Sequence, residues 1–185
     1  MNWRRFEYFL NAIFYILWFY SIKSYRRLER VHNYLLSPIT KFISKHLLTK
    51  KQKEYFYRKH VKYDSLNEKA LYDKKTGMHI GLAENLFNLF YLCYFISISY
   101  VLIGIFTDVY SSRNNSFFFI VIIGIPGYLI AYKAVYSNYR YLKYFKKFEK
   151  KDERWHKKWR LISIIFRLGG VISIILGLYV CGKFW

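Results

Sequence analysis

Acidic residues are scarce in this chain, and so are cysteine and proline. Only 11 of the 185 residues are Asp or Glu, against 31 Lys and Arg, and the formal net charge is +20. Two cysteines permit at most one disulfide, so the chain cannot be held together by a disulfide framework. The composition is rich in Lys, Ile, Tyr, Phe and Asn, which is typical of an AT-rich bacterial or phage genome.

Motifs of enzymes and metal sites are also missing from the sequence. The five histidines (His32, His46, His60, His79 and His156) show no paired ligand spacing, and no acidic residue stands where a zinc site needs one. There is no phosphate loop, nucleophile elbow or dinucleotide fingerprint. We therefore expect a protein that is not an enzyme and that holds no cofactor or metal.

Long apolar stretches are what the chain has in abundance. Four of them cover residues 6–22, 87–106, 117–132 and 161–180, which is near the length of about 20 residues that crosses a membrane. They are continuous runs without the alternation of a β-barrel strand. The sequence predicts an all-α, polytopic integral membrane protein: a single membrane domain, 1–185, with four transmembrane helices and cytosolic helical extensions at 23–83 and 133–160.

The distribution of positive charge predicts how the chain crosses the membrane. Residues 23–83 carry 15 Lys and Arg and residues 133–160 carry 11, whereas the connection 108–115 holds only Arg113. Basic loops stay on the cytosolic side, so we expect loops 23–86 and 133–160 in the cytosol and both termini outside the cell inner membrane. The first stretch lacks a small-residue cleavage site, which favours a retained anchor over a signal peptide.

The first basic segment shows two helical patterns. Residues 25–35 continue the first apolar stretch, Ser37 and Pro38 are expected to interrupt the helix, and residues 39–47 form an amphipathic helix. This helix either lies on an anionic inner leaflet or is solvated beside it. Residues 73–77 have the composition of a turn.

The second basic segment combines an aromatic stripe with a basic face. The stripe has heptad spacing and is broken only by Asp152; its members are Tyr141, Phe145, Phe148, Trp155 and Trp159. The basic face consists of Lys143, Lys146, Lys147, Lys150, Lys151, Lys157 and Lys158. We expect one helix that continues the third span, with the stripe packed on residues 25–47 of the same chain, on another subunit or on another protein. The two tryptophans can instead belong to an interfacial belt.

Small residues form a row on the fourth span. Gly169, Ser173, Gly177 and Cys181 are spaced by four and allow close helix contact, either within the subunit or between subunits. Cys93 and Cys181 differ in depth by about 18 Å in ideal helices, so we expect no disulfide between them. In the third span, Gly124, Pro126 and Gly127 permit a kink, as a gating hinge or a passive bend.

A few polar residues lie inside the predicted spans. Arg167 is expected to snorkel to the headgroups, to line a hydrated path or to pair with Glu84. Asn88 follows Glu84 by four residues, and Glu7 and Asn11 repeat this spacing near the outer end of the first span. These side chains can line a pore or tie the helices together.

Several functions are compatible with this pattern. The main hypothesis is an oligomer that forms or regulates a pore. At the level of architecture only, the predicted protein, with several spans and basic cytosolic helices, resembles membrane effectors or accessories of bacterial antiviral defence systems. The alternatives are a non-conducting scaffold that recruits a soluble protein or nucleic acid through its basic cytosolic face, and a small transporter. The expected partners are a bilayer with an anionic inner leaflet, further copies of the chain and that soluble partner.

Overall fold

The computed structural model describes residues 2–46, 49–106 and 109–183, and all secondary structure in these ranges is helical. The prediction of an all-α fold is confirmed. The long helices are α1 (Trp3–His46), α2 (Lys50–Tyr72), α3 (Met78–Phe106), α4 (Val109–Ala131) and α6 (Glu153–Lys183). Between α4 and α6 lie the π-helix η1 (Tyr132–Tyr136), the 3-10 helix η2 (Ser137–Tyr139) and the short helix α5 (Arg140–Phe148).

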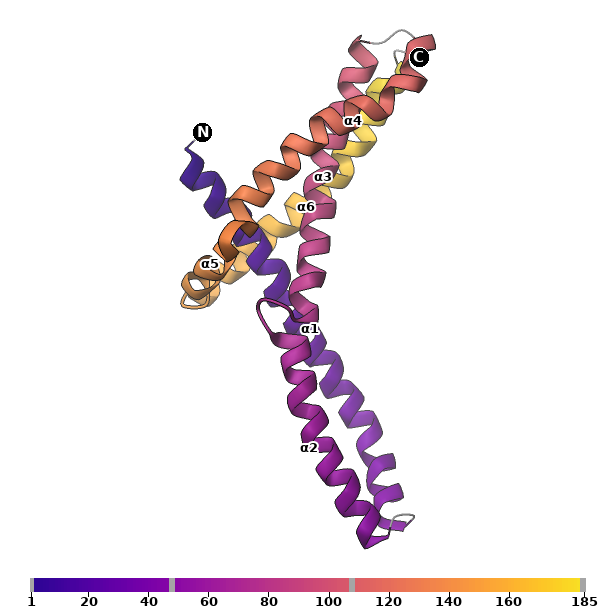
Figure 1. The fold of residues 1–185 in the computed structure, drawn as a ribbon, viewed down its shortest axis with the longest axis vertical. Coiled ribbons are helices and arrows are strands. Elements are labelled where there is room, and N and C mark those ends of the chain that lie inside the picture. Colours follow the sequence, from indigo (N-terminus) through magenta and orange to yellow (C-terminus); the bar gives the residue numbers. More distant parts are fainter. Residues whose placement is uncertain (1, 47–48, 107–108, 184–185) are drawn as a thin grey trace. The chain divides into compact units, whose positions relative to one another are not determined.

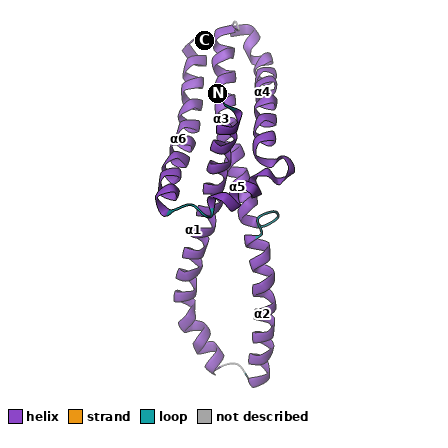
Figure 2. Ribbon diagram, turned by 90° about the vertical axis from the view of Figure 1, so that its left-hand side faces the viewer, coloured by secondary structure: helices purple, strands orange, loops and turns teal. Residues whose placement is uncertain are grey.

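The helices belong to two compact units. The bundle unit comprises Met1–Leu17 and Ala83–Trp185, and the hairpin unit comprises Trp18–Leu82. Within the bundle unit, α3 and α6 run in the same direction and α4 runs in the opposite one (Figure 2). Helix α1 contributes to both units: its N-terminal part, up to Leu17, belongs to the bundle unit, and the rest belongs to the hairpin unit (Figure 1).

Among the residues that the structure describes, three segments are long and apolar enough to cross a membrane: Met78–Ile105, Ile120–Phe148 and Glu153–Gly182. They contain most of the second, third and fourth predicted spans. Aliphatic side chains such as Leu89, Leu129 and Ile175 stay exposed on them, as expected for helices that contact lipid. These features indicate a membrane protein. The first predicted span, residues 6–22, is not among the three.

The N-terminal part of α1 lies in the core of the bundle unit. All side chains from residue 10 to residue 18 are buried within the protein. The ring of Phe14 contacts the rings of Phe87 and Phe145, at centroid distances of 5.7 Å in both cases. The apolar character of this segment is thus used against other helices of the same chain.

The aromatic stripe of the second basic segment packs on the N-terminal part of α1, before Trp18. Tyr15 contacts Phe145 at 5.1 Å, Phe148 at 5.5 Å and Trp155 at 6.1 Å between ring centroids. Tyr8 contacts the Trp159 ring at 5.7 Å. The expectation that residues 25–47 cover the stripe is therefore wrong, because the covering residues lie earlier in the same helix.

The contacts of α1 with α6 also define its direction. Phe9 contacts Phe166, whereas Tyr15 contacts Trp155, so α1 runs antiparallel to α6. These contacts lie at the end of the bundle unit where α4 ends and α6 begins. The sequence placed Glu7 and Asn11 near the outer end of the first span, away from the basic segment 133–160, whereas in the structure Glu7 lies beside Arg140 of that segment.

Proline does not interrupt α1. The helix continues from Trp3 to His46 with Pro38 inside it, which corrects the expected break at Ser37 and Pro38. A proline removes one main-chain hydrogen bond and bends a helix, and the bonds on either side can carry the helix past it.

The connection from α4 to α6, in contrast, is broken where one helix was expected. Asn138 and Tyr139 have positive φ angles of 54° and 52°, in the left-handed region that interrupts a helix. A second break precedes α6, where the Asp152 carboxylate accepts a hydrogen bond from the Trp155 amide at 3.2 Å. This is the geometry of a helix N-cap, and it explains the one polar position in the stripe.

In the hairpin unit, α2 runs back antiparallel to the C-terminal part of α1 (Figure 1). Near the open end of the hairpin, Tyr72 contacts the Tyr25 ring at 6.3 Å and the Arg26 guanidinium at 5.0 Å. The predicted turn at 73–77 is confirmed. The Asp73 carboxylate accepts hydrogen bonds from the amides of Lys75 and Thr76, which hold its pKa below the usual value. A side chain at Gly77 would lie 2.5 Å from the Asp73 carbonyl oxygen, so only glycine fits.

Candidate functional site

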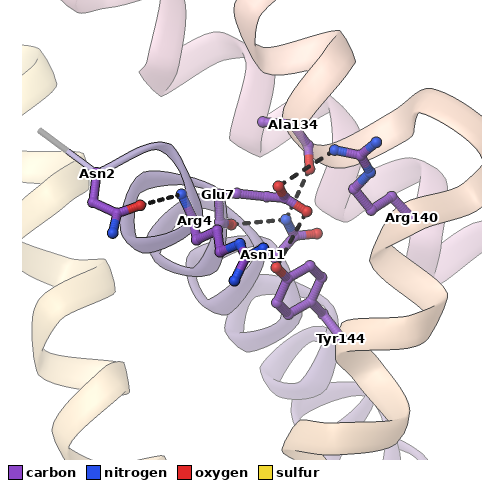
Figure 3. A network of polar contacts seen from close by, with 7 residues as sticks. All are labelled: Asn2, Arg4, Glu7, Asn11, Ala134, Arg140 and Tyr144. Atoms are coloured by element: carbon purple, nitrogen blue, oxygen red, sulfur yellow. Dashed lines mark hydrogen bonds and ion pairs between the residues drawn. The ribbon is translucent and has the colours of Figure 1, made fainter.

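A polar junction joins α1 to the connection between α4 and α6. Glu7 forms an ion pair with Arg140 at 3.3 Å, and its carboxylate accepts a hydrogen bond from the Tyr144 hydroxyl at 3.1 Å. The Asn11 amide group donates to the carbonyl oxygens of Glu7 and Ala134, at 2.8 and 2.9 Å. Figure 3 shows these side chains converging from α1, η1 and α5.

The junction is largely removed from solvent. The Glu7 side chain is 12% exposed and that of Arg140 34% exposed, while Asn11 is fully buried. A buried charge is tolerated when it is paired and hydrogen-bonded, and both conditions hold for Glu7. Ala134 belongs to the π-helix, and its carbonyl oxygen gains a partner from Asn11.

The sequence identified half of this junction. It singled out Glu7 and Asn11 by their i, i+4 spacing, but it did not connect them to Arg140, Tyr144 or Ala134. Those partners lie more than 120 residues away along the chain, and no local pattern reports such a contact. Chemically, this arrangement holds α1, η1 and α5 together. Both carboxylate oxygens of Glu7 are occupied, Oε2 by Arg140 and Oε1 by the Tyr144 hydroxyl.

Two other polar candidates inside the apolar helices, Asn88 and Arg167, form hydrogen bonds with a neighbouring helix or within their own helix. The Asn88 side chain accepts a hydrogen bond from the Tyr136 hydroxyl at 3.1 Å, which ties α3 to η1. Arg167 donates from Nε to the Ser163 carbonyl oxygen of its own helix at 3.3 Å. No ion pair connects Arg167 to Glu84 within the part of the chain that the structure describes.

The row of small residues on α6 faces α3. A Cβ atom added at Gly177 would lie 2.9 Å from the Ser97 carbonyl oxygen, and one added at Gly169 would lie 2.5 Å from the Tyr94 hydroxyl oxygen. At the end of the row, Cys181 lies against Gly104; both cysteines carry free thiols. The row is thus occupied inside the subunit, which is one of the two alternatives left open by the spacing.

Hydrogen bonds between α3 and α6 reinforce this contact, and a further glycine that the sequence pattern did not identify takes part in it. The Tyr94 hydroxyl donates to the Phe166 carbonyl oxygen at 2.6 Å, and the Ser97 hydroxyl donates to the carbonyl oxygen of Ser173. Gly170 is also in close contact, with its hypothetical Cβ 3.0 Å from the Phe90 carbonyl oxygen. It follows Gly169 directly, so a search for spacings of four alone could not find it.

The predicted hinge residues of the third span lie inside one helix. Helix α4 continues through Pro126. Gly127 sits against the Phe95 ring of α3, where a Cβ would come within 2.6 Å of a ring carbon, whereas a Cβ at Gly124 would meet nothing within 4 Å. Close packing explains Gly127, and the irregular backbone follows later, in η1 and η2.

The predicted basic face is divided among α5, the turn after it and the start of α6. Five of its lysines line an open hollow of about 540 Å³: Lys143, Lys146, Lys147, Lys150 and Lys151. The remaining two, Lys157 and Lys158, are exposed on the first turns of α6, and Lys157 pairs with Glu153 at 3.1 Å. The opposite side of α5 is buried through Tyr141, Phe145 and Phe148.

A second surface, not singled out as a site by the sequence, lies on the hairpin unit. Leu28, Val31, Leu35 and Ile39 are 54–66% exposed and follow one another at spacings of three and four, so they share one face of α1. We call these four residues the aliphatic stripe. Beside it, Arg27, Arg30 and Tyr34 line a shallow hollow of about 460 Å³ together with Val31 and Leu35.

Comparisons with known proteins give no match, whether to a protein family, to a curated protein or to a solved structure. Within the described ranges, no group of three or more His, Cys, Asp or Glu residues is placed to hold a metal ion. The function is therefore inferred from the residues and their arrangement.

Proposed function

We propose that this protein is a membrane-anchored, non-catalytic scaffold. In this proposal the bundle unit anchors the chain in the cell inner membrane, and the hairpin unit is a cytosolic docking surface for a soluble, acidic protein. The observation that carries the proposal is the exposed aliphatic stripe of α1 beside arginine side chains.

The charge distribution supports three spans rather than four in this proposal. If α1 does not cross the membrane, Arg4 and Arg5 join the basic segments on the cytosolic side, which then holds 28 of the 31 Lys and Arg residues. Arg113 and Lys183 stay outside, and Arg167 lies within a span. This division follows the positive-inside rule more closely than the four-span alternative does. It also agrees with Glu7 lying beside Arg140.

The use of the polar groups favours a scaffold over a pore. Glu7 and Asn11 are engaged in the polar junction, and Asn88 and Ser97 bind to neighbouring helices. The small-residue row, which could have joined subunits around a channel, is engaged by α3 of the same chain. These polar groups therefore tie helices of the chain to one another.

The hairpin unit has the chemistry of a docking surface. It carries 15 Lys and Arg against five Asp and Glu, so a partner with acidic residues is attracted to it. Four large aliphatic side chains in a row are costly to leave in water, at about 25 cal/mol per Å² of apolar area. A partner that covers them gains this free energy, and the neighbouring Arg27 and Arg30 can pair with its carboxylates.

The aliphatic character of the stripe distinguishes between kinds of partner. Nucleic-acid bases stack on aromatic rings, whereas Leu28, Val31, Leu35 and Ile39 offer no ring. A second copy of the hairpin would bring two strongly basic surfaces together, which costs free energy. An acidic, amphipathic helix of a soluble protein satisfies both the charge and the apolar face.

Site-specific photo-crosslinking in cells tests this proposal. A photoreactive amino acid at Leu35 should crosslink to a soluble acidic protein identified by mass spectrometry, and Arg27→Glu with Arg30→Glu should abolish that product. The matched control is the same probe at Asn33, which is exposed on a different face of α1 and should give no such product. A Leu35 probe that crosslinks only lipid, nucleic acid or a second copy of the chain contradicts the scaffold.

A pore is the second candidate function, and the position of Arg167 is the observation that favours it. Arg167 lies in the apolar part of α6, where a charge is costly by about 2.5–3.5 kcal/mol on insertion scales, and its Nε donates only to a carbonyl oxygen of its own helix. In an oligomer, Arg167 could face a hydrated path formed between copies. Ion flux through reconstituted vesicles separates this candidate from the scaffold.

A further inference from the structure

The lysine hollow on α5 is independent of the hairpin unit and of any partner bound there. It lies entirely within the bundle unit, and its lining consists of five lysines without an acidic residue. The hollow is open to the exterior and has a volume of about 540 Å³.

The orientation of these lysines is fixed by the other side of α5. Phe145 and Phe148 are fully buried and Tyr141 is 5% exposed. Phe148 stacks on Trp155 at 4.9 Å, and Phe145 contacts Tyr15 at 5.1 Å, between ring centroids. Because one side of α5 is held in the core, Lys143, Lys146 and Lys147 on its other side point to the exterior. Lys150 and Lys151 are exposed in the turn that follows the helix.

Three acidic residues lie close to these lysines in the sequence: Glu149, Asp152 and Glu153. Asp152 is engaged by the Trp155 amide and Glu153 by Lys157. No ion pair joins any of the five lysines to an acidic side chain in the described ranges. Lys147 lies over the Tyr8 ring at 5.7 Å, which positions it without neutralising it.

The position of α5 along the chain suggests which anion is close by. Helix α5 lies between the apolar stretch at residues 117–132 and the apolar stretch that begins at residue 161. Trp155 and Trp159 lie between α5 and this run and pack on α1, so α5 comes shortly before the point where the chain becomes apolar enough to enter the membrane, which is the level of the lipid headgroups. The anion that a membrane offers at this level is a lipid phosphate.

We propose that the lysine hollow of α5 is a binding site for the headgroup phosphate of an anionic phospholipid. Each lysine near an anionic membrane surface contributes to binding, and five around one hollow retain an anionic lipid against exchange with zwitterionic lipid. The site holds α5 at the membrane surface and thereby orients the turn between the third and fourth apolar segments.

Thermal unfolding of the full chain in a non-ionic detergent tests the proposal. Short-chain phosphatidylglycerol should raise the melting temperature in a saturable way, and short-chain phosphatidylcholine should not. Glycerol 3-phosphate at the same concentration distinguishes a lipid site from a site for soluble phosphate, and it should have little effect. A single-stranded oligonucleotide serves as the nucleic-acid arm and should not compete with the lipid.

A matched pair of variants locates the effect. Lys146→Gln, Lys150→Gln and Lys151→Gln combined should weaken the apparent affinity for phosphatidylglycerol at least tenfold, and the three Lys→Arg changes should preserve it. The control removes three charges from the hairpin unit (Lys50→Gln, Lys51→Gln and Lys69→Gln) and should leave the affinity unchanged.

Several results would overturn the proposal. One is an equal shift with phosphatidylcholine or with glycerol 3-phosphate, and another is an equal loss of affinity in the control variant. If the Lys→Gln variant does not fold, the comparison of phosphatidylglycerol, phosphatidylcholine and glycerol 3-phosphate on the wild-type protein still tests the proposal. Native mass spectrometry then adds the number of lipid molecules that stay bound.

Discussion

Replacing Gly177 with leucine is expected to destabilise the protein, whereas the same change at Gly182 is not. Both glycines lie in α6. At Gly177 a Cβ atom would lie 2.9 Å from the carbonyl oxygen of Ser97 and 3.1 Å from its Cα, so the obstacle is the backbone of α3. At Gly182 a Cβ atom meets nothing within 4 Å.

The magnitude follows from two opposing terms. Inserting carbon atoms into a well-packed contact costs about 1–3 kcal/mol, and we expect the upper part of this range because a backbone cannot move aside like a side chain. Removing a helical glycine gains up to about 1 kcal/mol. Gly177→Leu should therefore lose about 2 kcal/mol, and Gly182→Leu should stay within about 1 kcal/mol of the wild type.

Thermal unfolding in one detergent, followed by circular dichroism, measures this difference. With about 2–4 °C per kcal/mol for a chain of this size, the melting temperature of the Gly177→Leu variant should fall by about 4–8 °C. Equal melting temperatures for the two variants would refute the packing of α6 on α3 through this row. The row would then be free to contact lipid or another subunit.

Three further predictions concern the polar junction, the topology and the pore. Glu7→Gln and Arg140→Gln should each cost about 1–3 kcal/mol of stability, less than a fully buried pair, and the double variant should cost less than their sum; additive losses in a double-mutant cycle would show that the pair contributes nothing as a pair. In a background without the two native cysteines, a cysteine at Asn2 should resist an impermeant thiol reagent in intact cells while one at Asn114 reacts; labelling at Asn2 from outside would instead support a first helix that crosses the membrane. Arg167→Leu should leave vesicles as ion-tight as the wild type; flux that is lost in this variant and partly kept in Arg167→Lys would favour the pore.

The helical class and three of the four apolar segments could be predicted from the sequence because both depend on local properties. A run of about 20 apolar residues is recorded in the sequence whatever surrounds it. The turn at 73–77 was predictable for the same reason, since an aspartate at the start and a glycine at the end satisfy it locally.

The role of the first apolar segment could not be predicted in this way. Hydropathy measures the preference of a side chain to leave water, and it does not report whether lipid or protein receives the side chain. Phe14 and Tyr15 leave water by packing on aromatic residues more than 120 positions later. The polar pair Glu7 and Asn11 was the available signal, because two such groups are better satisfied beside Arg140 and a free carbonyl group than beside lipid.

The aromatic stripe shows how a regular pattern can survive a break in the helix that it predicts. Its heptad spacing suggested one continuous helix, yet α5 ends at Phe148 and α6 begins at Glu153. Phe148 and Trp155 still stack, because both helices present their rings to the same face of α1. Asp152 was the sign of the break: an aspartate in an apolar seam is costly inside a helix, but as an N-cap it satisfies the Trp155 amide. A single polar residue in a heptad seam, followed by a charged first turn, therefore favours two helices that share one partner over one long helix.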